Sequence, residues 1–160
     1  MISGVLAMVA LPSFGNLIKN NRLTSQANSA LGSFNYARSE AVNRAVNVRV
    51  EPLSAGSDWS TGWQVRIDGN NDDDFADAED TVIRNFDAIE NGSLTSENTN
   101  VYLDYDIDGT ATAKQSDGTE HSTVKTLELK LQATECTGEH VRRFTVNLGG
   151  HGRVVKENCP

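Results

Sequence analysis

Oxygen-bearing side chains recur at alternate positions in an acidic stretch, residues 68–79, which reads DGNNDDDFADAE. The candidate ligands are Asp68, Asn70, Asp72, Asp74 and Glu79. Their spacing approximates that of a helix–loop–helix calcium site, whose ligands are oxygens. However, Asp73 stands where the sharp turn of that loop requires glycine, and the flanking segments have strand patterns. This excludes an EF-hand and leaves two interpretations, a looser calcium loop and, more commonly for such sequences, a solvated acidic hairpin tip.

Thiol and imidazole groups gather near the C-terminus. The residues are Cys136, His140, His151 and Cys159. By type they could form a Cys₂His₂ zinc site, but their spacing matches no compact zinc module. In an exported chain the two cysteines instead predict one disulfide, with both histidines exposed on a hairpin beside it. A disulfide closing a loop of this length stabilises a fold by about 3 kcal/mol.

Basic residues are concentrated at the same end of a chain whose formal net charge is −8. A hairpin in residues 142–156 could present Arg142, Arg143, Arg153 and Lys156 to the phosphates of DNA. The alternative is a strand face neutralised by neighbouring glutamates. Phe144 is expected in the core, so no aromatic side chain supports base stacking. The overall acidity excludes a protein that coats nucleic acid or anionic lipid with its whole surface.

No motif for catalysis accompanies these groups. The sequence lacks a Gly-x-Ser-x-Gly elbow, a phosphate-binding loop and a His-Glu-x-x-His pair. It therefore favours a non-enzymatic protein without a cofactor. Apolar and charged contents of 38% and 22% are typical of a folded globular domain.

The sequence predicts a long helix N-terminal to all of these groups. From residue 13 to 45 apolar residues recur every three or four positions, which predicts one amphipathic helix. Residues 1–14 carry no charge, and Pro12 is expected to kink the helix without ending it. This uncharged run falls short of the about 20 residues needed to cross a bilayer. It is either a buried core helix or the end of a longer apolar helix.

The pattern then changes to strict alternation, which predicts strands. Segments of this kind lie at residues 46–50, 62–67, 81–86, 101–105, 126–131 and 142–148, and no second helix is indicated. We therefore expect an α+β fold in which one long N-terminal helix packs on an antiparallel, sandwich-like head of about six to eight strands. The helix would occupy residues 1–45 and the β-rich head residues 46–160.

Specific residues in this arrangement resemble those of a known family. The segment PSFGNLIKNNRLTSQANSALGSFNYARSEAVNR contains Pro12, the Tyr36–Ala41 stretch YARSEA, and Arg44. Gly62-Trp63, the acidic loop followed by Val82-Ile83-Arg84, and Gly152-Arg153-Val154 with Cys159 complete the pattern. The chain resembles type IV pilus minor pilins of the FimT/FimU kind, which share their domain with the type II secretion pseudopilin GspH.

The resemblance implies a structural role in a filament. Such proteins begin with a processed Gly-Phe-Thr-Leu-Ile-Glu segment, so about ten apolar residues are expected before Met1 in the natural protein, and residues 1–14 would be the rest of the membrane and filament-core segment. The residues of this segment that are candidates for contact with the membrane or the filament core are Val5, Leu6, Val9, Leu11, Pro12 and Phe14. The implied partners are other minor pilins, the major pilin and, before assembly, the inner membrane. The head would face the periplasm and later the outside of the pilus, near its tip.

One sequence difference distinguishes this chain from the FimT-type members of the family. FimT-type competence pilins end in Gly-Arg-x-Arg and use both arginines on DNA, whereas Val155 occupies the second arginine position here. Losing a phosphate contact weakens DNA binding. The sequence thus favours a FimU-like pilin that supports pilus assembly and twitching motility. A DNA-binding FimT-like pilin and a GspH-like pseudopilin are the alternatives.

Overall fold

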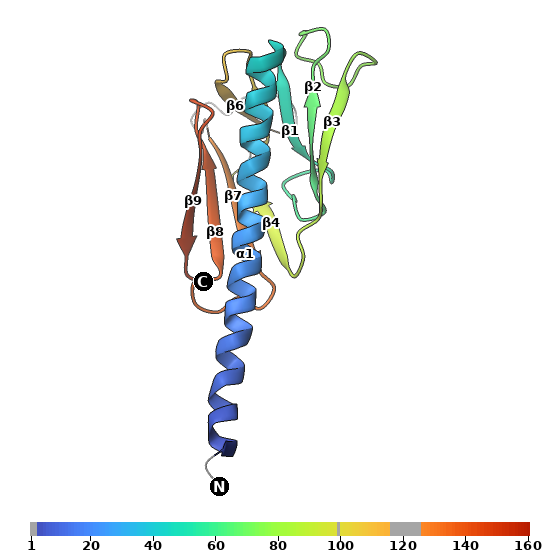
Figure 1. The fold of residues 1–160 in the computed structure, drawn as a ribbon. Coiled ribbons are helices and arrows are strands. Elements are labelled where there is room, and N and C mark those ends of the chain that lie inside the picture. Colours follow the sequence, from blue (N-terminus) through green and yellow to red (C-terminus); the bar gives the residue numbers. More distant parts are fainter. Residues whose placement is uncertain (1–2, 99, 116–125) are drawn as a thin grey trace.

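One long helix lies along two antiparallel sheets (Figure 1). The structure is a computed structural model that describes residues 3–98, 100–115 and 126–160, with backbone only for residues 3–14 and 100. The helix is α1 (Ser3–Arg44), and the strands within the described ranges are β1 (Val48–Pro52), β2 (Trp63–Ile67), β3 (Thr81–Phe86), β4 (Gly92–Ser96), β5 (Asn100–Tyr105), β6 (Ala111–Gln115), β7 (Leu127–Ala133), β8 (Val141–Val146) and β9 (Gly152–Glu157). The predicted α+β architecture is confirmed, and the described residues form nine strands where about six to eight were expected.

The strands form two sheets with the orders β3-β2-β1-β5-β6 and β4-β7-β8-β9. All neighbouring strands are antiparallel. The six predicted strands are present as β1, β2, β3, β5, β7 and β8, and β1 ends at Pro52 but begins at Val48, two residues later than expected. The predicted C-terminal hairpin is β8–β9. Strands β4 and β6 were not predicted.

The helix turns into a strand within three residues, 45–47. α1 ends at Arg44, and Ala45 adopts a positive φ of 53°. A left-handed residue after the last helical turn redirects the chain and satisfies its free carbonyl groups. Here Val46 N–H donates to the carbonyl of Ala41 at 3.4 Å. Two residues later β1 begins, so the head starts directly on the end of the helix.

A strip of mostly small residues on α1 is buried against both sheets. It consists of Leu23, Ala27, Ala30, Phe34, Ala37 and Ala41, spaced alternately by four and three. Such spacing keeps side chains on one helix face. The alanines allow the helix backbone to approach the strands closely, while Phe34 reaches further into the core. Leu17, Ile18 and Val42 also belong to the predicted apolar face, but each is about half exposed.

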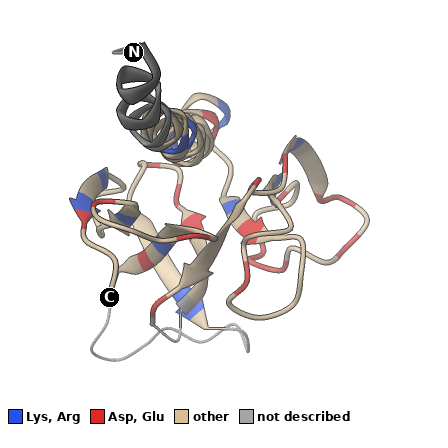
Figure 2. Ribbon diagram, turned by 90° about the horizontal axis from the view of Figure 1, so that it is seen from below, with Lys and Arg blue, Asp and Glu red and all other residues tan. Residues whose placement is uncertain are grey.

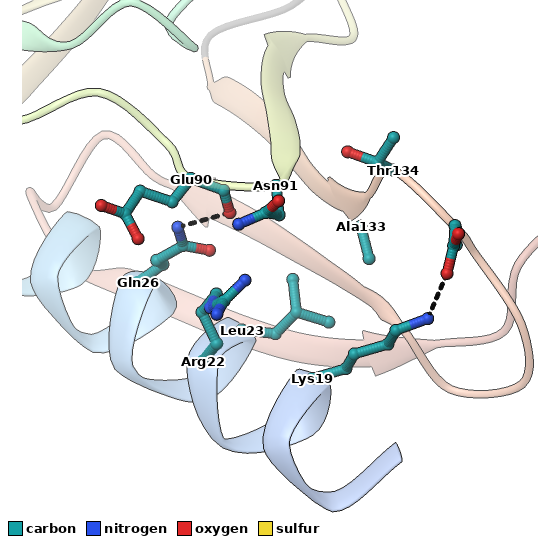
Figure 3. A pocket seen from close by; sticks show the side chains of 9 residues that line it. Lys19, Arg22, Leu23, Gln26, Glu90, Asn91, Ala133 and Thr134 are labelled. Carbon is teal, nitrogen blue, oxygen red and sulfur yellow. Dashed lines mark hydrogen bonds and ion pairs between the residues drawn. The ribbon is translucent and has the colours of Figure 1, made fainter. Parts of the chain in front are cut away.

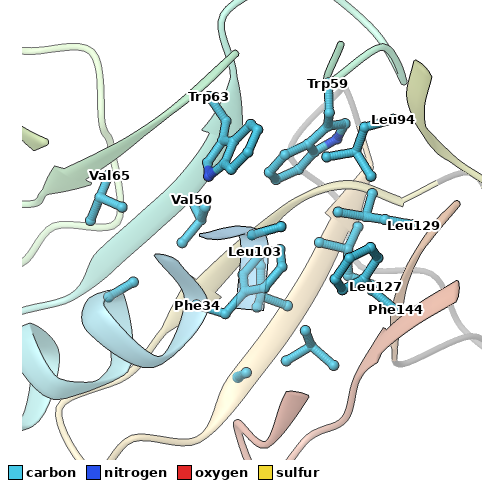
Figure 4. Close-up of a cluster of buried hydrophobic side chains, with 14 of the residues drawn as sticks. Phe34, Val50, Trp59, Trp63, Val65, Leu94, Leu103, Leu127, Leu129 and Phe144 are labelled. Atoms are coloured by element: carbon cyan, nitrogen blue, oxygen red, sulfur yellow. The ribbon is translucent and has the colours of Figure 1, made fainter. Parts of the chain in front are cut away.

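Aromatic rings connect the two sheets beneath the helix (Figure 4). Trp59 lies 6.1 Å from Phe34 and 6.4 Å from Trp63, measured between ring centroids. The backbone N–H of Trp59 donates to the carbonyl of Leu94 in β4 at 2.8 Å. On the helix side, the indole N–H of Trp63 donates to Ser33 Oγ at 2.8 Å, which satisfies a buried polar group. The core is therefore shared by α1 and both sheets.

Arg38 of the YARSEA segment fastens the upper end of α1 to two hairpin turns. Its Nε donates to the carbonyl of Gly109 at 2.9 Å, in the turn between β5 and β6. The turn between β8 and β9 also lies close to Arg38, at Gly150, which has a φ of +73°. A Cβ at residue 150 would lie 2.2 Å from the carbonyl oxygen of Gly109 and 2.9 Å from Arg38 Nε. The two turns can meet over Arg38 only because residue 150 has no side chain.

We predict that Gly150→Ala lowers the free energy of unfolding by about 3 kcal/mol, because backbone strain adds to a clash that cannot relax. Gly56→Ala is the matched control, since Gly56 has a φ of +87° and open space around it. It should cost only about 1 kcal/mol of strain. Urea unfolding followed by the fluorescence of the two core tryptophans measures both values. Equal losses for the two variants would contradict the packing described here.

Candidate functional site: an assembly surface

The acidic loop, for which calcium binding was the less favoured interpretation, is folded by hydrogen bonds among its own residues. Asp68 is fully buried, and its carboxylate accepts the backbone N–H groups of Asn71, Asp72 and Asp73 at 2.5, 3.3 and 2.9 Å. The Asn70 amide donates to Asp72 and Asp77 at 3.0 and 2.9 Å. Among the described residues, no group of three or more His, Cys, Asp or Glu side chains could hold a metal ion. Asp74 and Glu79 remain exposed.

One aromatic side chain attaches this loop to the sheet. Phe75 is buried against the guanidinium of Arg49, which lies 4.1 Å from its ring centroid. The other face of Arg49 covers Tyr102 at 4.0 Å, and its Nε and Nη2 donate to the carboxylate of Asp104 at 2.7 and 2.8 Å. Stacking and paired charge-assisted hydrogen bonds together fix the arginine. The acidic loop is thus a docked structural element of the head.

The cysteines form the predicted disulfide between Cys136 and Cys159, with Cα atoms 5.6 Å apart. It joins the β7–β8 loop to the end of the chain after β9. His151 is exposed as expected. The expectation for His140 was wrong, because this side chain is 7% exposed and packs beneath the loop. Neither histidine belongs to a metal-binding group in the described chain.

The four proposed DNA-contacting residues do not share a face. In β8–β9, Arg142 is paired with Lys156, and Phe144 with Val154, on the side toward α1. Arg143 and Arg153 lie on the opposite side. Arg142 is only 2% exposed and donates to Asn20 of α1 at 2.5 Å, so it is a structural residue. Its position follows from the core position of Phe144, two residues later on the same strand face.

Arg143 is held between carboxylates. Its Nε and Nη2 donate to Glu157 at 2.7 and 3.0 Å, and Nη1 pairs with Glu97. The hydrogen bonds that Arg143 donates to Glu157 and Glu97 raise the pKa of Arg143. The same pair holds the pKa of Glu157 below its ordinary value. This is the salt-bridged strand face considered as the alternative to DNA binding. Basic and acidic segments alternate around the head when it is seen from below (Figure 2).

The lower part of α1 extends beyond the sheets (Figure 1). Leu17 and Ile18, the first large apolar side chains that the structure places, are 54% and 48% exposed. The candidate contacts Val5, Leu6, Val9, Leu11, Pro12 and Phe14 precede them, and their side chains lie outside the described part of the structure. In the ranges that are described, no helix combines the length and apolar character needed to cross a bilayer.

A cavity of about 250 Å³ opens where α1 leaves the head (Figure 3). Lys19, Arg22, Leu23 and Gln26 border it from α1, and the chain around Glu90–Asn91 and Ala133–Glu135 closes the other side. Lys19 Nζ is paired with the exposed Glu135 at 2.5 Å, and Gln26 donates to the carbonyl of Glu90 at 3.0 Å. We call this cavity the foot pocket. It continues past Gln26 into a groove of about 470 Å³ between α1 and β3.

The sequence interpretation assigned no role to the foot pocket or to Arg38. A signal existed for the pocket, since Lys19, Arg22 and Gln26 recur at helical spacing beside the buried Leu23. The opposite wall comes from two distant loops, which a single sequence does not bring together.

Comparisons with known proteins bear on the family and on the fold. A family profile described as "Type II transport protein GspH" matches residues 26–150. Two crystal structures of the type IV minor pilin FimU from Pseudomonas aeruginosa PAO1 are similar. The P21 form has a TM-score of 0.61 and 18% identity over 88% of this chain and 92% of that chain. The P65 form has a TM-score of 0.57 and 18% identity over 84% and 91%. No curated protein matches the sequence.

We predict that replacing both cysteines by serine lowers the free energy of unfolding by about 3 kcal/mol, because the loop between residues 136 and 159 is no longer closed in the unfolded chain. The measurement is the urea midpoint of the variant. Thiol-reduced natural protein should behave in the same way. An unchanged midpoint in both samples would contradict a stabilising disulfide.

Acid should weaken the Arg143–Glu157 pair. The pKa of Glu157 is lower in the folded protein than its ordinary value of 4.5. The stabilisation of the fold by this pair is therefore complete above pH 4.5, and it is lost as the pH falls through the pKa of Glu157 in the folded protein. Arg143→Met should therefore lose less stability than the natural protein between pH 5 and 2. Arg153→Met, on the same strand face, is the control. Parallel pH profiles for all three proteins would refute this coupling.

Proposed function

The chain belongs to the GspH family, and we propose that it is a FimU-like minor pilin of a type IV pilus. In this role it joins other minor pilins and the major pilin, with its helix in the inner membrane and its head in the periplasm before assembly. Afterwards it lies in the pilus, close to the tip, where it supports assembly and twitching motility. The observation that carries the proposal is the continuation of α1 past the head with Leu17 and Ile18 uncovered.

Two exposed aliphatic side chains on a projecting helix favour packing against neighbouring helices, because this removes apolar surface from water. The head meanwhile needs rigidity, which the shared core and the disulfide provide. The proposed function is mechanical, without a catalytic step. Pilin-like subunits of this family are structural proteins, in agreement with the lack of a catalytic motif in the sequence.

A GspH-like pseudopilin of a type II secretion system is the second candidate, favoured by the description of the matching family. It would use the same helix and head in a secretion system instead of a pilus. A FimT-like DNA receptor is less favoured, because Arg142 is buried and Arg143 is paired with glutamates. Only Arg153 and Lys156 of that set are exposed, on opposite faces of the hairpin.

The test is a deletion strain carrying the natural gene, a Leu17→Asp/Ile18→Asp variant, or the control Asn28→Asp/Asn35→Asp, which alters exposed positions higher on α1. We expect the deletion and the Leu17/Ile18 variant to lose sheared pili and twitching, with protein secretion unchanged. The control should restore both.

Loss of secretion with normal piliation would instead identify the pseudopilin. No effect on either process would overturn both candidates. A gel shift of double-stranded DNA at micromolar protein and moderate salt, weakened by Arg153→Ala, would favour the DNA receptor.

A further inference from the structure

The sequence contains a single Asn-Gly pair, Asn91-Gly92, at the point where the turn after β3 enters β4. We propose that Asn91 is a site of spontaneous deamidation, at which the folded chain modifies its own backbone at the rim of the foot pocket. The reaction consumes water and needs no enzyme or cofactor. This inference goes beyond the proposed function and does not depend on it.

The chemistry is an attack of a main-chain nitrogen on the side-chain amide before it. The nitrogen of Gly92 gives up its proton and forms a bond with Cγ of Asn91. The Cγ–Nδ2 bond breaks, and Nδ2 leaves as ammonia with that proton. Water then opens the five-membered succinimide at one of its two carbonyl groups. The products are aspartate and isoaspartate, in which the main chain runs through the former side chain.

The Gly92 N–H that must react faces away from the sheet. Thr134 of the β7 side donates its N–H to the carbonyl of Asn91 at 3.0 Å. In β4 the N–H of Leu94 points to the opposite side, where it donates to Ser60 Oγ at 2.9 Å. N–H groups two positions apart on a strand point the same way, so the Gly92 N–H also lies on the side away from β7. On that side no hydrogen bond of Gly92 is present among the residues that the structure describes.

The Asn91 amide is open to the attack. Asn91 is exposed, has a φ of 54°, and lies at the rim of the pocket beside Glu90 (Figure 3). Gly92 has no side chain to obstruct ring closure. A Cβ at residue 92 would lie 2.6 Å from the carbonyl oxygen of Gln132 in β7. The strand pairing therefore requires glycine at the position that makes the preceding asparagine reactive.

Asn71 provides a comparison within the same chain. It is also exposed and has nearly the same backbone conformation, with a φ of 58°. However, its Oδ1 accepts the N–H of Asn47 at 3.0 Å. The N–H that would attack it, that of Asp72, donates to Asp68 at 3.3 Å. Both hydrogen bonds must break before the ring can close, so we expect reaction at Asn91 and protection at Asn71.

Deamidation changes the foot pocket in two ways. Lys19 and Arg22 are balanced there by Glu90 and Glu135, and either product at residue 91 adds one negative charge. Isoaspartate also lengthens the main chain beside the hydrogen bond that residue 91 accepts from Thr134. The pocket of an aged molecule thus differs in charge and in shape from that of a newly made one.

Mass spectrometry of the purified protein tests the site. The folded protein and the same chain unfolded in guanidinium are kept in mildly alkaline buffer and digested at intervals. The peptide with residue 91 should gain about 1 Da and separate into two forms, one of them labelled by an isoaspartyl methyltransferase. Its rate in the folded protein should be within about ten-fold of the unfolded rate, since an open turn is little protected. It should exceed the rate at Asn71 in the folded protein at least about ten-fold.

Asn91→Gln is the control variant, because its longer side chain would have to close a six-membered ring, which forms far more slowly. Its peptide should keep the original mass, and thermal unfolding checks that the variant is folded. Protection of Asn91 by the fold beyond about ten-fold, or equal rates at Asn91 and Asn71, would overturn the proposal. The assay follows only the covalent state of purified protein, so its failure would leave the proposed function standing.

Discussion

The structure depends on the close approach of α1 to two sheets at once. Ala27, Ala30, Ala37 and Ala41 keep the contact face of the helix narrow, so that strands from both sheets lie against the same strip. Larger side chains would force the helix away from one sheet, because cores resist added volume. Phe34 fills the space that remains beneath the helix, beside Trp59 and Trp63. The helix is therefore the central structural element of the head as well as its extension.

Polar contacts place the ends of the head relative to this helix. Arg38 positions two turns at the upper end, and Asn20 receives Arg142 at the lower end. Charged hydrogen bonds of this kind are directional and costly to lose when buried. The foot pocket and the β5–β6 turn are consequently presented at fixed positions along α1.

The long helix, its burial strip and six strands could be predicted from the sequence because their apolar periods are clear. Strand β6 escaped prediction since its buried side chains, Ala111 and Ala113, are too small to produce a hydrophobic alternation. In β4 only Leu94 is buried. The disulfide was predictable because the chain has two cysteines, whereas the burial of His140 depends on a loop folding back toward α1. The foot pocket joins residues more than sixty positions apart, and no local pattern specifies such proximity.

The orientation of α1 has a mechanical consequence. The buried strip runs parallel to the helix axis over about five turns. A pull applied along the axis would load these contacts in shear, so that they share the force and must slip together. A pull perpendicular to the helix axis would instead break these contacts one after another. Tension transmitted along a fibre would thus act on the head in its most resistant direction.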